Sequence, residues 1–305
     1  MTRLLLADVL PLEDPAAYAS LYGMTSSERK RTADSFRFMK DRMLSVGASA
    51  LLDAGLREFG LRERDMTYGR SEHGKPFFVN APEIHFNISH SASKVAVAFS
   101  DREVGCDIEE AFAAGLSAHS VEQEAAAFSD REVGCDIGEA FAARLSAQSV
   151  EQEAAKCLEM AGRFFSREEY LAVKAAESPS ECIRTFYRCW TLKESYMKAT
   201  GLGLSLAPDS FSVAALCTGD SCSLLRHTRC LDCLSPTTVD VGGVDDVGDS
   251  CFLRQTGCLD CLSHKVADGF VFYTVDSFEG YECALCCRPE AGVPELEFVR
   301  LGERK

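Results

Sequence analysis

The chain has 305 residues, of which 46% are hydrophobic, and its formal net charge at pH 7 is −15. This length can form one large domain or two modest ones around a real core. The negative charge argues against generic binding to nucleic acid or an anionic membrane, because both need an excess of lysine and arginine. No apolar run approaches the roughly 20 residues of a membrane span, and the first residues lack a signal-peptide pattern. We therefore expect a globular cytoplasmic protein.

The 15 cysteines are numerous but odd in number, and they are scattered through predicted strands and helices. Buried thiols in a reducing compartment show this distribution, whereas a disulfide framework pairs an even set. The sequence therefore favours free thiols.

Residues 1–8 predict a first strand, and a basic helical segment follows at residues 29–42, which holds six cations against two acids. Ser26 or Ser27 can cap this helix, which is expected to run to about Gly55. The segment is either a solvated helix face or a local site for an anion, and its apolar positions follow helical spacing: Phe36, Met39, Met43 and Val46.

A turn is predicted at residues 69–76, where Gly74 and Pro76 frame Lys75. Such a loop position suits a side chain that reaches a ligand better than one that packs in a core.

Strands are predicted over residues 84–89, 94–100 and 103–109. Because side chains alternate along a strand, Asp107 and Glu109 point the same way, off the core face. Two neighbouring carboxylates repel each other unless a cation joins them, and Mg²⁺ prefers one or two carboxylates with water and phosphate oxygens. The alternative is a pair of exposed acids at a strand edge.

A helix is predicted from Pro179, capped by Ser178, to Lys198, with Gly201 as its end. Glu194 and Lys198 are four residues apart and share one face. They are either a surface ion pair or a third carboxylate and a cation delivered to the acidic strand.

An internal repeat dominates the middle of the chain: residues 98–126 recur as 127–155, with 26 of 29 positions identical. Structural repeats diverge further and come in larger numbers, so this pattern indicates a recent duplication or a gene-model feature. Glu109 of the first copy is replaced by Gly138 in the second. We therefore expect the first copy to supply the metal-binding acids, and we expect Asp136 and Gly138 to take no part in the site.

A weaker repeat pairs residues 225–235 with 253–263 and creates two Cys-x-x-Cys sequences. This spacing fits a zinc site, but duplication alone also produces it, so an insertion without metal is the main expectation. The cysteines concerned are Cys230, Cys233, Cys258 and Cys261. Residues 269–276 and 281–287 predict a closing hairpin.

Four motifs occur in order: residues 74–76 (GKP), 86–91 (FNISHS), 105–109 (GCDIE) and 190–195 (WTLKES). Together they resemble the 4′-phosphopantetheinyl transferase superfamily, in particular its larger monomeric branch that activates surfactin-type synthetases. The similarity runs from Arg3 to Val299 and includes residues 163–166 and 208–213. Each motif alone is weak, whereas four in order are specific.

The resemblance implies a mixed α/β (α+β) fold, built as a pseudo-dimer of two similar α/β halves with the active site in the cleft between them. The halves would be residues 1–100 and 101–305, with a duplicated insertion at about 127–155 and a cysteine-rich one at about 217–266.

The resemblance also implies that the enzyme moves the 4′-phosphopantetheine arm of coenzyme A onto a serine of an apo carrier protein and releases 3′,5′-ADP. The carrier would serve fatty acid, polyketide or nonribosomal peptide synthesis. Catalysis would use Glu194 and Asp107, with Glu194 deprotonating the serine. Mg²⁺, or Mn²⁺ in its place, would bind Asp107, Glu109 and Glu194. The residues expected to contact coenzyme A are Arg42, Lys75, Ser89, His90 and Lys198.

Two other interpretations stay open. A catalytically impaired homologue would bind coenzyme A as a scaffold, and a zinc-dependent interaction module would use the cysteine-rich region.

Overall fold

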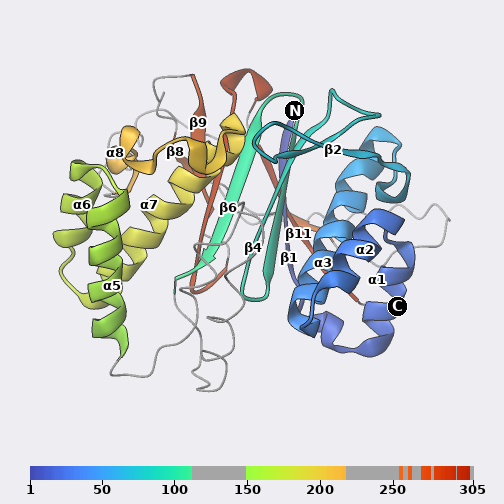
Figure 1. Cartoon of the computed structure of the whole chain (residues 1–305), viewed down its shortest axis with the longest axis horizontal. Coiled ribbons are helices and arrows are strands. Elements are labelled where there is room, and N and C mark those ends of the chain that lie inside the picture. The colour runs from blue at the N-terminus through green and yellow to red at the C-terminus, as the bar shows by residue number, and fades with distance from the viewer. Residues whose placement is uncertain are drawn as a thin grey trace.

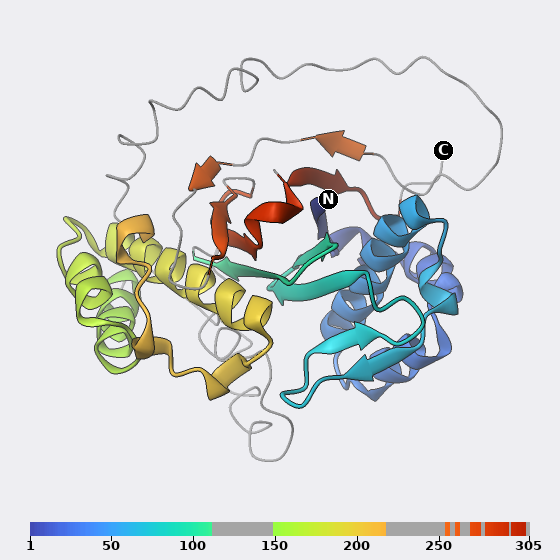
Figure 2. The same ribbon diagram turned by 90° about the horizontal axis from the view of Figure 1, so that it is seen from above.

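The computed structural model describes residues 1–111, 149–217, 254–256, 260–262, 269–275, 278–292 and 294–302. These residues form a mixed α/β fold with two main sheets between two groups of helices (Figure 1). Seen from above, the helices near the N-terminus and those of the later part of the chain lie on opposite sides of the sheets (Figure 2).

The first sheet has the strand order β4-β5-β1-β11-β7 within the described residues. Strand β1 runs antiparallel to β5 and parallel to β11, so both ends of the chain contribute to this sheet. The division of the chain at residues 100 and 101 stays a prediction. The strands are β1 (Thr2–Asp8), β4 (His85–Ser91), β5 (Lys94–Ser100), β7 (Arg254–Thr256) and β11 (Glu295–Val299).

The second sheet has the order β6-β10-β9-β8 in the described part of the chain, and all its pairs are antiparallel. Its strands are β6 (Val104–Glu110), β8 (Asp260–Leu262), β9 (Val271–Thr274) and β10 (Tyr281–Cys287). The predicted closing hairpin is therefore confirmed as β9 and β10. A small third sheet, which was not predicted, pairs β2 (Tyr68–Arg70) with β3 (Pro76–Phe78) on either side of the turn that holds Lys75.

Three apolar clusters hold these layers together. One lies between the first sheet and the helices α1 (Pro15–Met24), α2 (Ser27–Ser35) and α3 (Met39–Leu56). A second joins the inner faces of the two sheets, with Leu4 and Leu6 of β1 packed in one cluster with Val104 and Cys106 of β6. The third lies between the second sheet and α5 (Ser149–Phe164), α6 (Arg167–Lys174), α7 (Pro179–Thr200) and α8 (Ala214–Cys217).

The connections contain short 3₁₀ helices at Leu10–Glu13, Arg57–Phe59, Glu63–Asp65, Gly203–Ser205, Pro208–Ser210 and Pro289–Ala291. Among the described residues, no helix has the length and apolar character needed to cross a membrane.

The basic segment differs from its prediction, because one long helix is replaced by two. Ser26 caps α2 as expected, but residues 36–38 are exposed, and Phe36 and Phe38 are extended, before α3 begins at Met39. The guanidinium of Arg42 donates to the Phe36 carbonyl over 2.9 Å, which satisfies a backbone group that helix continuation would have used. Phe36 and Met39 are consequently exposed and do not face the core.

The helix that carries Glu194 is confirmed as α7. The Ser178 hydroxyl accepts a hydrogen bond from the Glu181 amide, and Gly201 ends the helix with a φ of 73°. The carboxylate of Glu181 accepts from the Glu177 amide, so it does not complete the second half of a capping box.

Candidate active site

Strand β6 presents two different faces. Val104, Cys106 and Ile108 pack into the cluster between the sheets, as the alternation predicts. Gly105 and the acids Asp107 and Glu109 lie on the opposite face, toward α7. A β-carbon at Gly105 would overlap backbone atoms of α7, so the missing side chain lets the helix lie directly on the strand.

The acids are not exposed, which corrects the expectation of a solvent-facing pair. The exposed fraction is 1% for Asp107 and 5% for Glu109, because α7 covers their face of the strand. Exposed acids at a strand edge are therefore excluded as an interpretation. Burying two neighbouring carboxylates is costly unless cations or hydrogen bonds compensate them.

Asp107 has two polar partners on one oxygen. The Ser89 hydroxyl donates to Asp107 Oδ1 over 2.8 Å, and the Lys198 ammonium donates to the same oxygen over 2.7 Å. Lys198 also lies 3.2 Å from Ser89 Oγ. The second oxygen, Oδ2, is buried and has no hydrogen-bond partner. The structure thus brings three of the predicted site residues into one cluster.

Glu109 accepts a hydrogen bond from the Ser91 hydroxyl over 3.1 Å. Burial raises the pKa of Glu109 well above its usual range, and the charge of Asp107 raises it further; Lys198 and Ser91 oppose the shift, while Glu194 adds to it. Ser91 was not predicted as a site residue. Its position two residues after Ser89 on β4 could have indicated it, because both side chains then share one face of the strand.

Glu194 and Lys198 both project from α7, and Glu194 is half-buried. The charge of Glu194 acts on Glu109, so the third predicted carboxylate lies within electrostatic reach of the strand pair. Within the described ranges, however, no three histidine, cysteine or acidic side chains come together as a ready-made metal cage.

The donor set still fits a hard divalent cation. Mg²⁺ needs one or two protein carboxylates and takes its other ligands from water and substrate phosphate. The unpartnered Oδ2 of Asp107 is a buried acceptor without a donor, and a cation would satisfy it. Asp107 and Glu109 are therefore the residues that could hold the ion, and Glu194 lies within electrostatic reach of Glu109.

Lys75 reaches from the β2–β3 turn to the end of α7. Its ammonium donates to the carbonyl oxygens of Val104 over 2.9 Å and Ala199 over 3.1 Å. Burial lowers the pKa of Lys75 to about 8. The turn itself is closed by Gly74 in the left-handed region, with a φ of 85°. Lys75 thus connects the first half of the chain to both elements of the acid cluster.

His90 and Arg42 come from other parts of the fold than the serines and the lysine that contact the acids. His90 is half-buried on β4, and strand alternation places its side chain on the face opposite to Ser89 and Ser91. Arg42 contacts the Phe36 carbonyl, and its charge also acts on Tyr18 of α1. No described contact joins Arg42 to Asp107.

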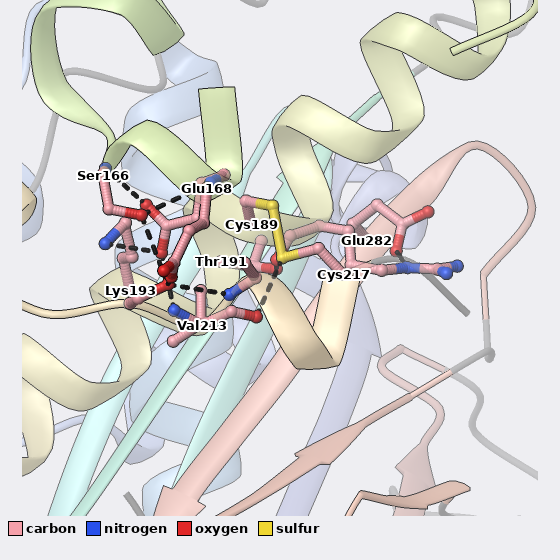
Figure 3. Close-up of a disulfide and its surroundings, with 12 residues drawn as sticks. Ser166, Glu168, Cys189, Thr191, Lys193, Val213, Cys217 and Glu282 are labelled. Atoms are coloured by element: carbon pink, nitrogen blue, oxygen red, sulfur yellow. Dashed lines mark hydrogen bonds and ion pairs between the residues drawn. A yellow bond between two sulfur atoms is a disulfide. The ribbon is translucent and has the colours of Figure 1, made fainter. Parts of the chain in front are cut away.

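A second buried ion pair involves Lys193 of α7, which is labelled in Figure 3, and was not predicted. The Lys193 ammonium donates to Glu169 Oε1 over 2.8 Å and to the carbonyls of Pro208 and Phe211, each over 2.7 Å. Glu169 also accepts from the Val213 amide over 2.6 Å. This pair connects α6 and residues 208–213 to α7.

A disulfide joins Cys189 of α7 to Cys217 of α8, with their Cα atoms 5.5 Å apart (Figure 3). The expectation of free thiols throughout is therefore wrong at this pair, because the fold places two buried cysteines from distant positions side by side. Among the described side chains, free thiols occur at Cys106, Cys157, Cys182, Cys283 and Cys286.

Several predictions fall outside the described residues. These are Asp136 and Gly138 of the second repeat copy, and Cys230, Cys233 and Cys258 of the possible zinc site. Cys261 lies on β8, and residues 149–155 at the end of the second copy form the first turns of α5.

Comparison with known proteins agrees with the motifs. A model of the 4′-phosphopantetheinyl transferase superfamily matches residues 132–233. The chain is 28% identical over 189 residues to a 4′-phosphopantetheinyl transferase of Bacillus subtilis, and 29% identical over 189 residues to the 4′-phosphopantetheinyl transferase Sfp of Bacillus subtilis strain 168. Each of these alignments covers 62% of this chain and 65% of the relative.

A relative from another bacterium gives a similar result. The chain is 28% identical over 183 residues to the 4′-phosphopantetheinyl transferase AcpT of Salmonella typhimurium, and this alignment covers 57% of this chain and 72% of the relative. The resemblance predicted from the four motifs is confirmed. The chain spans somewhat less than two thirds of the length of the Bacillus subtilis relatives named above.

Proposed function

We propose that this chain, as a Sfp-like member of the 4′-phosphopantetheinyl transferase superfamily, transfers the 4′-phosphopantetheine arm of coenzyme A to a serine of an apo carrier protein. The names of the similar proteins support the reaction, and the cluster of Asp107, Glu109 and Lys198 between β6 and α7 is the observation that carries it. Phosphoryl transfer depends on positioning and charge neutralisation more than on covalent catalysis, and this cluster offers both signs of charge.

In the proposed reaction the serine hydroxyl oxygen attacks the phosphorus atom that carries the pantetheine arm. A new phosphorus–oxygen bond forms to the serine, the pyrophosphate bond breaks, and 3′,5′-ADP leaves. Glu194 accepts the serine proton, because it is half-buried, projects from α7 and lies within electrostatic reach of the acid pair. Lys198 and Lys75 neutralise phosphate charge from the end of α7.

Asp107 and Glu109, with Glu194, would hold Mg²⁺ or Mn²⁺. When bound, the ion would supply positive charge to the pyrophosphate and favour its cleavage. His90 and Arg42 would contact the far end of coenzyme A. Arg42 lies in the first turn of α3, and His90 shares a face of β4 with Ile88, which packs against the cluster beneath α1–α3.

The architecture supports a binding site between two α/β halves, each a sheet with helices on its outer face. We include in the proposal that the protein is a cytoplasmic monomer, and that its carrier domains belong to fatty acid, polyketide or nonribosomal peptide synthesis.

The test is to incubate the protein with labelled coenzyme A, Mg²⁺ and a panel of apo carrier proteins. Transfer should add the label to one or more carriers, with one 3′,5′-ADP released for each. Glu194→Gln is the matched control, since it keeps the size of the side chain and removes the base. Binding of coenzyme A without release of 3′,5′-ADP would contradict transfer and identify the scaffold interpretation.

A further inference from the structure

The contact between Lys198 and Asp107 has an unusual setting. The lysine side chain is 9% exposed and the aspartate side chain 2%, so the ion pair is almost dry. It lies beside a second buried carboxylate, Glu109, and within the field of Glu194. The Lys198 ammonium therefore lies beside two buried acids, one of which, Glu109, is also within electrostatic reach of Glu194.

One monovalent cation does not satisfy this cluster. Lys198 contacts Asp107 Oδ1, while Oδ2 stays buried without a donor. Glu109 receives the Ser91 hydroxyl, which is a neutral donor. Buried charges are stable only when they are paired and hydrogen-bonded, so the cluster as it stands is under-neutralised.

We infer that in the metal-free protein Lys198 occupies the position that a divalent cation takes on Asp107, so that the cation binds only when the ammonium leaves that carboxylate. This inference rests on the proposed function, which supplies the need for the cation. Lys198 would then have two states. Without a metal, its ammonium neutralises Asp107; with a metal bound, the ammonium has left Asp107 and faces the site.

The side chain is suited to such exchange. A lysine ammonium is a compact point charge on a flexible stem, whereas an arginine guanidinium holds a carboxylate through a rigid pair of donors. Lys198 also lies in the last turn of α7, two residues before the helix ends at Thr200.

The alternative is that Lys198 is a permanent structural partner of Asp107. In that case the ion would bind Glu109 and Glu194, and removing Lys198 would leave a buried, unpaired Asp107 without making the metal site easier to occupy. The two cases differ in the effect of Lys198 on metal affinity when coenzyme A is absent.

The experiment measures free Mn²⁺ by electron paramagnetic resonance in titrations of the purified full chain without coenzyme A. Lys198→Met should bind Mn²⁺ roughly ten- to a hundred-fold more tightly than the original protein, which is the affinity equivalent of one charge-assisted hydrogen bond. Lys198→Arg should bind no more tightly than the original, because it keeps a cation on Asp107.

Two controls separate the effect of the Lys198–Asp107 contact from the general effect of removing one positive charge. Lys40→Met removes a lysine whose charge acts on the neighbouring Glu110, and it should change Mn²⁺ affinity less than about twofold because solvent screens that exposed charge. Asp107→Asn should abolish the tight binding in the Lys198→Met background. If Lys198→Met proves too unstable to purify, Lys198→Gln replaces it, with the same direction and a smaller gain.

Unchanged or weaker Mn²⁺ affinity in both neutral variants overturns the inference, even where the original protein transfers phosphopantetheine normally. Tighter binding that depends on Asp107 supports it, even if no carrier protein is modified in the transfer assay. The inference and the proposed function can therefore fail separately.

Discussion

Gly105 of β6 lies beneath the backbone of Ser195 on α7, so closely that a β-carbon at position 105 would overlap the Ser195 carbonyl oxygen. The same β-carbon would overlap the amide nitrogen of Ala199 and lie 2.9 Å from the carbonyl carbon of Lys198. Backbone atoms cannot swing aside as a side chain can. This contact therefore fixes the distance between the strand that carries two acids and the helix that carries Glu194.

Gly105→Ala should push α7 away from β6. Overpacking of this kind typically costs about 1–3 kcal/mol of unfolding free energy. We expect a loss of transfer activity of at least about a hundredfold, because a displacement of roughly 1 Å in a catalytic group has that effect. Gly162→Ala on α5 is the matched control, since its β-carbon would lie 3.5 Å from the Tyr170 ring, an ordinary contact. Equal activity in the two variants would show that the strand–helix distance is unimportant.

Glu109→Gln should separate stability from function. The folded-state pKa of Glu109 lies above its unfolded value, so the folded protein holds this proton more tightly than the unfolded chain. Stability from this group is therefore present at low pH and is lost as pH rises from about 4.5 through the folded pKa.

The Glu109→Gln variant lacks that loss, so near pH 7 in EDTA its free energy of unfolding should be higher than that of the original protein. Its transfer activity should be nearly abolished. Thermal melts at several pH values, with exposed Glu159→Gln as control, test this; a less stable variant at pH 7 would contradict the origin that we assign to the shift.

Lys75 should give coenzyme A binding an alkaline limb. Its pKa is lowered to about 8 by burial, so the ammonium that attracts phosphate is lost above that pH. In the free enzyme kcat/KM for coenzyme A should fall as pH rises through about 8, with a smaller change in kcat. Lys75→Arg keeps its charge at every accessible pH and should remove the limb. A limb that persists in this variant would have to be assigned to another group.

Lys193→Met should destabilise the chain more than any surface exchange. It leaves the buried Glu169 carboxylate without its cation, and breaking such a pair costs about 3–5 kcal/mol. The matched control is Arg163→Met, whose partner Glu159 lies 3.9 Å away on the surface, where a pair contributes roughly 0–1 kcal/mol. Urea denaturation followed by tryptophan fluorescence reports both, because Trp190 is buried in the same helix. Equal midpoints would contradict a structural role for Lys193.

The sequence predicted local structure well wherever one short-range rule decides it. Alternation predicts β6 and the common face of Asp107 and Glu109, and capping residues predict both ends of α7. Burial of the acids was missed, because it depends on α7, and the contact through Gly105 joins residues 90 positions apart. The Lys193–Glu169 pair and the Cys189–Cys217 bond were missed for the same reason: no local pattern encodes a partner in another element.

The break between α2 and α3 was missed for a different reason. Phe36 and Met39 have the spacing of a core face. In the structure the chain leaves the helix at Phe36, and the Arg42 guanidinium donates a hydrogen bond to the Phe36 carbonyl oxygen. The apolar period is a weak signal over so short a segment, and it does not register a hydrogen bond from a side chain six residues away.

The repeat leads to the last prediction, because the described strand and helix come from different copies. Strand β6 belongs to residues 98–126, whereas the first turns of α5 belong to residues 127–155. The corresponding seven residues, 120–126 and 149–155, are identical in sequence. Deleting residues 127–155 therefore joins β6 to an α5 of unchanged sequence and keeps Glu109.

The superfamily model matches from residue 132, inside the second copy, where the strand sequence stands close to α5. Deletion of either copy leaves one strand sequence at this short distance along the chain from α5. The two deletions differ at the acid: removing residues 98–126 leaves Gly138 where removing 127–155 leaves Glu109. Glycine has no side chain with which to ligate a cation.

We expect the chain without residues 127–155 to match or exceed the original in transfer activity, and the chain without residues 98–126 to be nearly inactive. Adding Gly138→Glu to the second deletion should restore activity, because the two shortened chains then differ only at Gly115/Arg144 and His119/Gln148. Labelled coenzyme A and one apo carrier protein suffice for all four proteins. Equal turnover by the two deletions would refute the assignment of the site to Glu109, and failure of Gly138→Glu to rescue would move the difference to the other two positions.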